Sequence, residues 1–411
     1  MDIRVNGDRL WSSLMEMAEL GALPGGGSCR LALTDADVDA RDLFVKWCRE
    51  AGCDIAIDQA GNIFATRPGR NADAPAIATG SHLDTQPHGG RFDGVLGVLA
   101  GLEVVRTLND AGIETEKPVA AVNWTNEEGV RFPRGILGSA AYIGAIDVDS
   151  LHALQSTDGH VLGDELRRSG YLGDLAPGAF PMERFYEVHI EQGPVLEREG
   201  LPVGIVTAGQ GIRWFEVVVD GEDRHAGTTP MDVRRDSLVV AADMIRDLHS
   251  LGNDHRPDAR VTVGRLYVEP NAVSTVPGRT RFVIDLRHPD SGTLDRLERE
   301  IDALCRRAAA AGGCGVTVNR TMSLAPIAFD AECIATLEQA ASRLGLPNRP
   351  MISGAGHDAC NIATVLPAAM IFAPSRDGIS HNEAEYTEPE HCAAVCDVLL
   401  QAMMADAGAV R

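Results

Sequence analysis

The hydrophobic positions along the chain repeat with two different periods, and they predict strands and helices that alternate. Short apolar runs bounded by polar or glycine-rich loops are typical of strands, and apolar residues spaced three and four apart are typical of helices. Thr34 is expected to cap one helix, with an acid, Asp37, three residues on. The predicted strands are 54–58, 62–67, 77–84, 118–124 and 185–190, and the predicted helices are 8–20, 34–52, 95–105, 138–146 and 151–170.

From about Gly211 the order of elements changes. Strands at 213–220, 260–267, 280–287 and 314–320 and helices at 236–251 and 292–311 follow one another as β-α-β-β-α-β, the order of a ferredoxin-like unit. Helices at 330–344, 357–366 and about 388–405, with a strand at 368–373, then resume the α/β pattern. We therefore predict a catalytic domain of residues 1–209 and 322–411 and an inserted domain of residues 210–321.

Composition narrows the classes of function. The 411 residues are 45% hydrophobic and 23% charged, which is typical of a soluble globular protein. The net charge of −22 disfavours nucleic acids and anionic membranes, which bind basic surfaces. No apolar run approaches the roughly 20 residues that cross a bilayer, and the N-terminus lacks the apolar core of a secretion signal. Nine scattered cysteines without a C-x-x-C pair favour a reducing, cytoplasmic setting.

Polar residues follow the apolar strand 77–84, at the point where it should end. His82 and Asp84 close the strand, and Asp93 stands across a glycine-rich loop, just before a predicted helix. Ligands of open α/β sheets bind beyond the carboxyl ends of the strands, and histidine with carboxylate is a donor set for divalent metals. Taken alone, this H-x-D pattern fits a polar surface loop better than a metal site.

Other acids and histidines make a metal site the better interpretation than a surface loop. Most of them stand at predicted strand ends, and they are Glu127, Glu128, His189, His225 and His381. Glu127-Glu128 alone would fit a solvated strand end, and His225 a surface loop. The whole set is about what a two-metal site needs, with one acid bridging the ions. Side chains two apart in a strand share a side, so Asp84 could accept the free N–H of His82. The adjacent glutamates should diverge, one binding metal while the other acts as general base.

Seven motifs together resemble one family. They are Gly80–Thr85, Gly90–Gly94, Asn126–Phe132, His189–Pro194, His225–Pro230, Gly354–Asp358 and Ser380–His381. Their residues and order resemble the hydantoinase/carbamoylase amidases of the dinuclear-zinc aminoacylase and carboxypeptidase superfamily. The resemblance implies a metallo-aminopeptidase-like catalytic domain with a mixed sheet. It also implies that the inserted ferredoxin-like domain is a lid that makes the contact of a homodimer.

The resemblance assigns roles to single residues. The metal ligands it implies are His82, Asp93, Glu128, His189 and His381, with Asp93 bridging. Glu127 would be the general base, and Asp84 the partner of His82.

The family pattern also implies a set of substrate-binding residues. His225 would stabilise the oxyanion, and Arg287 would grip a substrate carboxylate through its planar guanidinium. Gln192 and Gly356 would line the pocket. Ser274 stands where the family usually has asparagine, which removes an amide donor and leaves the identity of the substrate open.

The predicted function is hydrolysis of the carbamoyl (ureido) C–N bond of a small N-carbamoyl amino acid or related ureido acid, with release of ammonia and carbon dioxide. Two divalent ions per subunit are expected. Zinc is the geometric default, and manganese, cobalt or nickel could use the same ligands. The alternatives are an aminoacylase or dipeptidase on the same metal core, and a non-catalytic binding protein that kept the fold.

Overall fold

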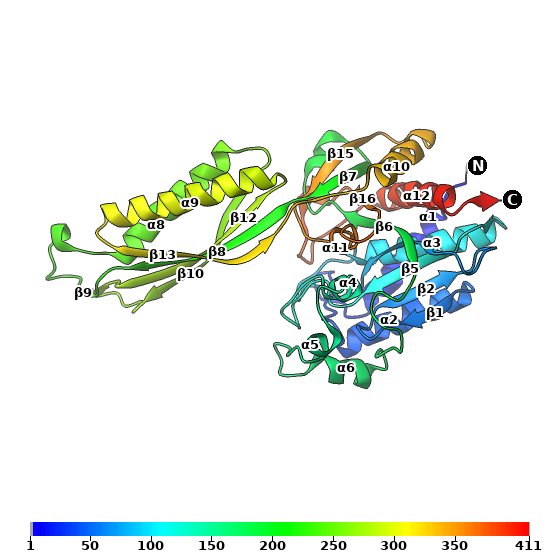
Figure 1. The fold of residues 1–411 in the computed structure, drawn as a ribbon, viewed down its shortest axis with the longest axis horizontal. Helices are drawn as coiled ribbons and strands as arrows, with labels where there is room; N and C mark the ends of the chain where they lie inside the picture. Colours follow the sequence, from blue (N-terminus) through cyan, green and yellow to red (C-terminus); the bar gives the residue numbers. More distant parts are fainter. Residues whose placement is uncertain (1–2, 411) are drawn as a thin grey trace. The chain divides into compact units, whose positions relative to one another are not determined.

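The chain divides into two units, each described here by itself (Figure 1). The structure is a computed structural model and describes residues 3–410. Residues 1, 2 and 411, at the ends of the predicted catalytic domain, lie outside the described part. The first unit comprises the residues up to Thr207 and those from Ala328 onward, and the second comprises Ala208–Ile327.

A mixed sheet forms the centre of the first unit. Its order is β1-β2-β5-β3-β6-β16-β7-β14, and β15 also pairs with β7. The four central strands are parallel to one another, whereas β1, β2 and β7 pair antiparallel. This confirms the predicted α/β class with a mixed sheet. The strands are β1 (Asp54–Ile57), β2 (Ile63–Arg67), β3 (Ala76–His82), β5 (Val119–Trp124), β6 (Met182–Ile190), β7 (Val203–Gly209), β14 (Ile327–Ala328), β15 (Asn348–Ser353) and β16 (Ala368–Ala373), with a separate pair β4 (Glu114–Thr115) and β17 (Ala409–Val410).

Helices complete the first unit. Every residue of β3, β5 and β16 is buried, as expected for parallel strands covered on both faces. The helices are α1 (Gly7–Glu19), α2 (Asp35–Glu50), α3 (Val95–Asp110), α4 (Leu137–Tyr142), α5 (Val148–His152), α6 (Leu162–Ser169), α7 (Val195–Glu199), α10 (Ala331–Arg343), α11 (Asp358–Ile362), η2 (Arg376–Gly378) and α12 (Pro389–Asp406). No helix within residues 3–410 combines the length and apolar character needed to cross a membrane.

A four-stranded antiparallel sheet of order β10-β12-β8-β13 forms the second unit. Alternate residues of its strands are apolar and pack against the two long helices α8 and α9, giving this unit its own core. A short antiparallel pair is formed by β9, which comes after the end of β8, and β11, which comes before the start of β12. The elements are β8 (Gly211–Asp220), β9 (Arg224–His225), η1 (Met231–Val233), α8 (Ser237–Asp254), β10 (Arg260–Glu269), β11 (Thr275–Val276), β12 (Arg279–His288), α9 (Ser291–Ala311) and β13 (Gly315–Leu324).

Two helix predictions were wrong in extent. The single helix expected at 151–170 is two short helices, because the polar turn around Gly159 separates α5 from α6. The helix expected at 357–366 stops at Ile362 and continues as turns, with hydrogen bonds from Thr364 N to Asn361 O and from Val365 N to Ile362 O.

The predicted cap of α2 also differs from the structure. Thr34 occupies the N-cap position, but its hydroxyl donates to the carbonyl of Leu31 at 2.7 Å instead of accepting from the helix. Asp37 instead accepts the N–H of Leu33 and pairs with Arg41 at 2.8 Å, and both side chains of this pair are fully buried. The start of α2 is therefore held by a buried ion pair.

Helix α3 lies unusually close to the sheet at Gly97. A Cβ at this position would lie 2.3 Å from the carbonyl oxygen of Val188 and 2.8 Å from the Cβ of Ser81. Only glycine therefore permits this approach. The contact matters because β3 ends in His82, β6 carries His189 next to its last residue, and α3 begins two residues after Asp93.

We expect Gly97→Ala to lower the free energy of unfolding. Alanine gains up to about 1 kcal/mol in helix propensity, but overpacking against backbone costs typically about 1–3 kcal/mol. Denaturant unfolding measures the net loss. The control is Gly292→Ala in α9, where the added Cβ would meet only Asp290 Oδ1, at 3.5 Å. Equal stability of the two variants would contradict the close packing of α3.

Candidate active site

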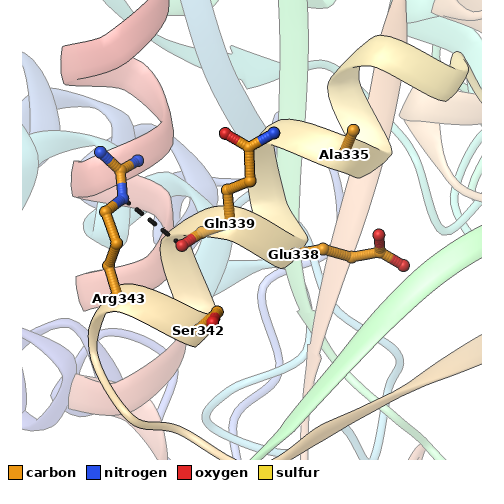
Figure 2. A pocket seen from close by; sticks show the side chains of 5 residues that line it. All are labelled: Ala335, Glu338, Gln339, Ser342 and Arg343. Carbon is orange, nitrogen blue, oxygen red and sulfur yellow. Dashed lines mark hydrogen bonds between the residues drawn. The ribbon is translucent and has the colours of Figure 1, made fainter.

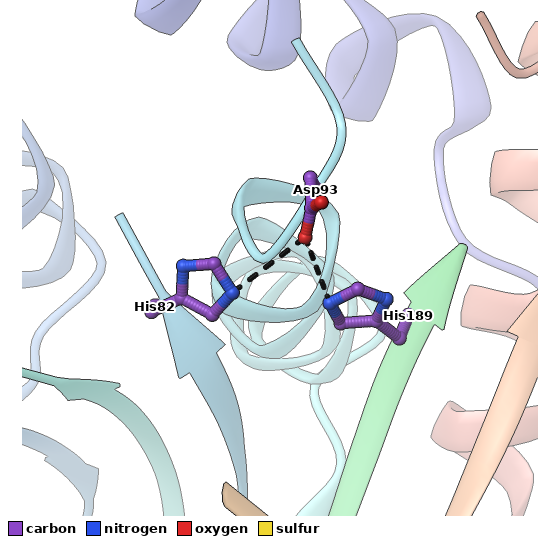
Figure 3. Close-up of side chains that lie close together, drawn as sticks. All are labelled: His82, Asp93 and His189. Carbon is purple, nitrogen blue, oxygen red and sulfur yellow. Dashed lines mark ion pairs between the residues drawn. The ribbon is translucent and has the colours of Figure 1, made fainter. Parts of the chain in front are cut away.

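Two buried histidines meet one aspartate at the carboxyl ends of parallel strands. His82 ends β3, His189 lies near the end of β6, and Asp93 lies in the loop before α3 (Figure 3). Asp93 Oδ1 is 3.1 Å from His189 Nε2 and 3.7 Å from His82 Nε2. These three side chains form the first ligand group, and their donor atoms lie within 4.8 Å of one another.

The other carboxylate oxygen of Asp93 faces a second ligand group. His381 Nε2 lies 3.3 Å from Asp93 Oδ2 and 3.6 Å from Glu128 Oε2. These three residues again place their donor atoms within 4.8 Å of one another. Asp93 thus offers one oxygen to each group, which is the arrangement of a carboxylate that bridges two cations.

The histidines of the first group are oriented as metal ligands. His82 Nδ1 lies 2.8 Å from the carbonyl oxygen of Asp84, and His189 Nδ1 lies 2.9 Å from that of Ile190. A carbonyl only accepts, so each Nδ1 must carry a hydrogen, and the Nε2 of a neutral ring keeps its lone pair. In the metal-free protein a proton on Nε2 pairs the His189 ring with Asp93. A cation among the three atoms would take the place of that proton and be bound by the nitrogen lone pairs, so the residues fit a divalent ion.

Carboxylates crowd this region, and Arg41 acts on Asp84 alone among the three described next. Burial, followed by the charges of Asp358 and Glu128, raises the pKa of Glu127 well above its usual value. Burial and the charge of Asp93 raise the pKa of Glu128 to about 8. Burial and Asp37 raise the pKa of Asp84 to about 7. A bound dication would be the largest local charge and would reverse these shifts.

The histidines respond oppositely to the same surroundings. Burial lowers the pKa of His82 to about 4. Burial also disfavours the charged ring of His189, but the hydrogen bond and the charge of Asp93 outweigh it and raise the pKa to about 9. The hydrogen bond with Asp93 raises the pKa of His381 to about 9 as well. Asp93 is therefore the dominant charge for two of the three rings.

Asp84 holds the site differently from the prediction. The His82 ring bonds to the main-chain carbonyl of Asp84, and the expected carboxylate oxygen is 4.0 Å away. The carboxylate instead accepts the backbone N–H groups of Glu127 and Glu128, at 3.1 and 3.2 Å. Asp84 therefore orients both His82 and the glutamate pair. The sequence could not distinguish these roles because the main-chain partner leaves no side-chain signal.

The two glutamates diverge, as the sequence predicted. Glu127 Oε2 lies 3.5 Å from His82 Nε2, whereas Glu128 faces His381 and accepts from Gln86 Nε2 at 2.6 Å. Asn126 precedes them with a φ of 56°, a left-handed conformation that asparagine tolerates. This turn directs one glutamate to each ligand group.

Two residues around Asp93, Ser380 and Glu385, were given no role from the sequence, and Gln192 was predicted only to line the pocket. Gln192, a predicted pocket residue, donates to Asp93 Oδ2 at 2.9 Å, and Ser380 Oγ lies at the same distance from that oxygen. Glu385 accepts the backbone N–H groups of Phe92 and Asp93, at 3.0 and 3.1 Å. An acid four residues after His381 was the only sequence signal for Glu385. Its burial shows that it belongs to the site's framework.

Gly356 lies in the loop before α11. A Cβ there would approach Ile136 Cδ1 at 2.7 Å. The glycine therefore allows close packing between this loop and the residue that precedes α4.

The remaining predicted residues belong to the second unit. His225 is exposed on β9 and pairs in register with Thr275, and the carbonyl of Ser274 accepts the N–H of Ala226 at 2.8 Å. His225 and Ser274 are thus neighbours. Arg287 lies near the end of β12, where Asp285 binds its Nε and Nη2 at 2.9 and 2.8 Å.

A hollow of about 430 Å³ on α10 contains none of the predicted site residues. Figure 2 shows that Ala335, Glu338, Gln339, Ser342 and Arg343 line it. All five lie on one helix, and Ala335 is the only apolar residue among them. It does not bring together the acids and histidines that the chemistry requires.

Comparison with known proteins identifies the family. Residues 78–405 match the profile of peptidase family M20/M25/M40. The chain belongs to this family. Within M20/M25/M40, it is 44% identical to the N-carbamoyl-L-amino-acid amidohydrolase of Rhizobium meliloti, over 99% of this chain and 98% of that protein. It is 34% identical to the allantoate amidohydrolase of Bacillus subtilis, over 90% of each chain.

A solved structure supports the same family assignment. The chain superimposes with a TM-score of 0.95 on a hydantoinase/carbamoylase family amidase from Burkholderia multivorans, with 47% identity and 99% of each chain covered. These M20/M25/M40 relatives confirm the resemblance stated from the motifs. They also confirm that the chain is a hydrolase of linear amide C–N bonds.

In the metal-free protein, the free energy of unfolding should fall as the pH rises from about 6.5 to about 9. The acids Asp84 and Glu128 have raised pKa values of about 7 and about 8, so their contribution to stability is complete below about 4, falls as the pH rises, and is fully lost above about 8. His189, raised from 6.5 to about 9, loses its contribution in the same range. His82 has the opposite sign, but its window lies between about 4 and 6.5.

Thermal unfolding of chelator-treated protein across this range measures the effect. A parallel sample with excess divalent metal should not show the fall, because bound cations replace the protons. A metal-free midpoint that stays constant or rises with pH would contradict the electrostatic description of the site.

Proposed function

We propose that the chain hydrolyses the carbamoyl C–N bond of a small N-carbamoyl amino acid or related ureido acid, in a reaction that depends on two divalent ions. The observation that carries this proposal is the carboxylate of Asp93, which offers one oxygen to each of two ligand groups. The named activities of the relatives support the substrate class.

The two ligand groups define which residues would hold the ions. His82 and His189 would bind one ion, Glu128 and His381 the other, and Asp93 both. Imidazole nitrogen and carboxylate oxygen suit zinc, and manganese, cobalt and nickel accept the same donors. When bound, the ions would polarise the ureido carbonyl and lower the pKa of a water molecule.

Glu127 is the proposed general base. Its carboxylate is nearly buried and lies 3.5 Å from His82 Nε2, beside the ligand groups but without a place in either of them. It would accept a proton from the attacking water and pass it to the leaving nitrogen. Ammonia then departs, and the carbamate that remains loses carbon dioxide to give the free amine. A positioned carboxylate of this kind contributes about 10²–10⁴-fold to the rate.

Residues of the second unit would recognise the substrate. Arg287 would bind the substrate carboxylate with two parallel hydrogen bonds. The pairing with Asp285 already orients the guanidinium of Arg287. His225 would donate to the developing oxyanion. Ser274, next to His225 in the β9–β11 pair, would contact the acid portion with a hydroxyl group.

If His225 and Arg287 act on one substrate, the geometry of the second unit favours a site shared by two copies of the chain. Strand β12 alone separates Arg279 from Arg287 by eight residues, about 26 Å at ~3.3 Å per residue. The β9–β11 pair, which carries His225, adjoins the Arg279 end of β12. One small acid cannot touch both ends of this ribbon, so His225 and Arg287 acting on one substrate would come from different subunits. This supports the expected homodimer.

The decisive test of the reaction is an ammonia assay. Purified protein loaded with zinc, manganese, cobalt or nickel should release ammonia from at least one of an N-carbamoyl amino acid, ureidopropionate, allantoate or ureidoglycolate. Hydrolysis of acyl amino acids or dipeptides without ammonia release would favour the aminoacylase alternative. Protein that binds metal but turns over neither class would favour a binding protein.

Glu127→Gln should keep both ions and lose turnover by about 10²-fold or more, because the amide keeps the shape of the side chain but cannot accept the proton. Metal analysis and the ammonia assay on the same preparation measure the two effects. Near-normal turnover would refute the assignment of Glu127 as base. Loss of metal would show instead that Glu127 is a ligand.

Mixing two inactive variants should restore activity if the substrate site is shared between subunits. In a hybrid dimer of His225→Ala and Arg287→Ala chains, one site carries both substitutions and the other carries neither. Random re-association makes half of the dimers hybrid, so about a quarter of all sites should be intact. The ammonia assay before and after mixing measures this. Failure of verified hybrids to regain activity would contradict the two-subunit site.

A further inference from the structure

A buried carboxylate beside the first ligand group has no part in the reaction described above. Glu187 lies on β6 two residues before His189, so the two side chains point to the same side of the sheet. The Glu187 side chain is fully inaccessible to solvent. A buried acid must have hydrogen-bond partners, and those of Glu187 lead to the site.

Each oxygen of Glu187 is bound to a different element. Oε1 accepts a hydrogen bond from Ser81 Oγ at 2.7 Å, and Ser81 directly precedes His82 on β3. Oε2 accepts the backbone N–H of Ala359 in α11 at 2.8 Å. One carboxylate therefore joins the strand that carries His82, the strand that carries His189, and helix α11.

The segment before α11 packs directly on the site. The rings of His357 and His189 contact edge to face, with centroids 4.5 Å apart. His357 Nε2 lies 2.8 Å from Ser353 Oγ. The next residue, Asp358, accepts from Ser139 Oγ at 2.5 Å. These contacts of His357 and Asp358 fix the start of α11. The hydrogen bond from the N–H of Ala359 in this helix therefore holds Glu187 in place.

The same side chains could be considered as a third metal site, since donor atoms of Glu187, His189 and His357 lie within 4.8 Å of one another. Their donor atoms are already in use, however. Both oxygens of Glu187 accept hydrogen bonds, His357 Nε2 bonds to Ser353, and His189 Nε2 faces Asp93. This cluster is therefore a support for the first ligand group.

The charge of Glu187 also favours a cation in the first ligand group. Both hydrogen-bond partners of Glu187, the hydroxyl of Ser81 and the N–H of Ala359, are uncharged. A buried carboxylate that lacks a cationic partner is unfavourable. A cation held by His82, His189 and Asp93 would provide the compensating charge.

We propose that Glu187 is a positioning residue for one of the two metal positions. It fixes the spacing of His82 and His189 through Ser81 and the β6 backbone, and it adds negative charge that favours a cation between them. This inference rests on the proposed dinuclear centre. It predicts that Glu187 affects the ion at His82 and His189 much more than the ion at Glu128 and His381.

The test is Glu187→Gln, which keeps the volume of the side chain and removes its charge. Affinity for one ion should fall about 10- to 100-fold, as is typical when a partner of a ligand is changed. After dialysis against a weak chelator, the variant should hold about one ion per chain where the wild type holds two. The absorption spectrum of the cobalt-loaded variant should change with the loss, and His82→Ala should show the same loss.

Glu103→Gln is the matched control. Glu103 is a buried acid on α3 of the same unit, and its Oε1 lies 2.7 Å from Nη2 of Arg9. Its variant should be less stable yet keep both ions, which separates a general loss of packing from a specific loss of metal. Glu187→Ala should lose the same ion as Glu187→Gln, and the glutamine variant alone decides the question if the alanine variant does not fold.

The outcomes distinguish this inference from the proposed function. Two ions and an unchanged cobalt spectrum in Glu187→Gln would overturn the role of Glu187 and leave the dinuclear centre intact. A wild-type protein that binds no ions would overturn the dinuclear centre itself. Equal loss of both ions in Glu187→Gln would also contradict the assignment to one position.

Discussion

The carboxylate of Asp93 and the rings that face it constrain the rest of the structure. Two imidazole nitrogens of the first group face one oxygen of Asp93, while His381 and Glu128 gather at the other. Without cations, protons on His189 and His381 pair these two rings with Asp93, and the carboxylates around them lie close together. Burial and the repulsion among the carboxylates raise the pKa values of Glu127 and Glu128. The fold must hold these groups together against their own repulsion, and it does so with hydrogen bonds from the backbone.

Backbone groups and buried carboxylates share that task. Asp84 accepts the N–H groups of the glutamate pair, and Glu385 accepts those of Phe92 and Asp93. Carbonyl oxygens fix the ring orientations of His82 and His189. The close packing of α3 at Gly97 fixes the strands from which these histidines project. The site is therefore rigid on its protein side, which is what a catalytic centre that binds its transition state requires.

The sequence predicted most of the regular structure because its signals are local. Strand β16 matches its predicted range, and α3 starts at the expected residue. The candidate metal ligands could be named because several acids and histidines stand at predicted strand ends in the order of the family motifs, whereas the H-x-D pattern alone would not have sufficed. Ser380 and Glu385 were missed because they act through loops whose course no periodicity specifies. The role of Asp84 was misassigned in detail because its carbonyl, present in every residue, makes the contact.

Anomalous diffraction from crystals of the metal-loaded protein tests most directly whether two ions share Asp93. Two anomalous peaks should lie on opposite sides of the Asp93 carboxylate. One should contact His82 and His189, and the other Glu128 and His381. A single peak, or two peaks that do not share Asp93 as a ligand, would contradict it.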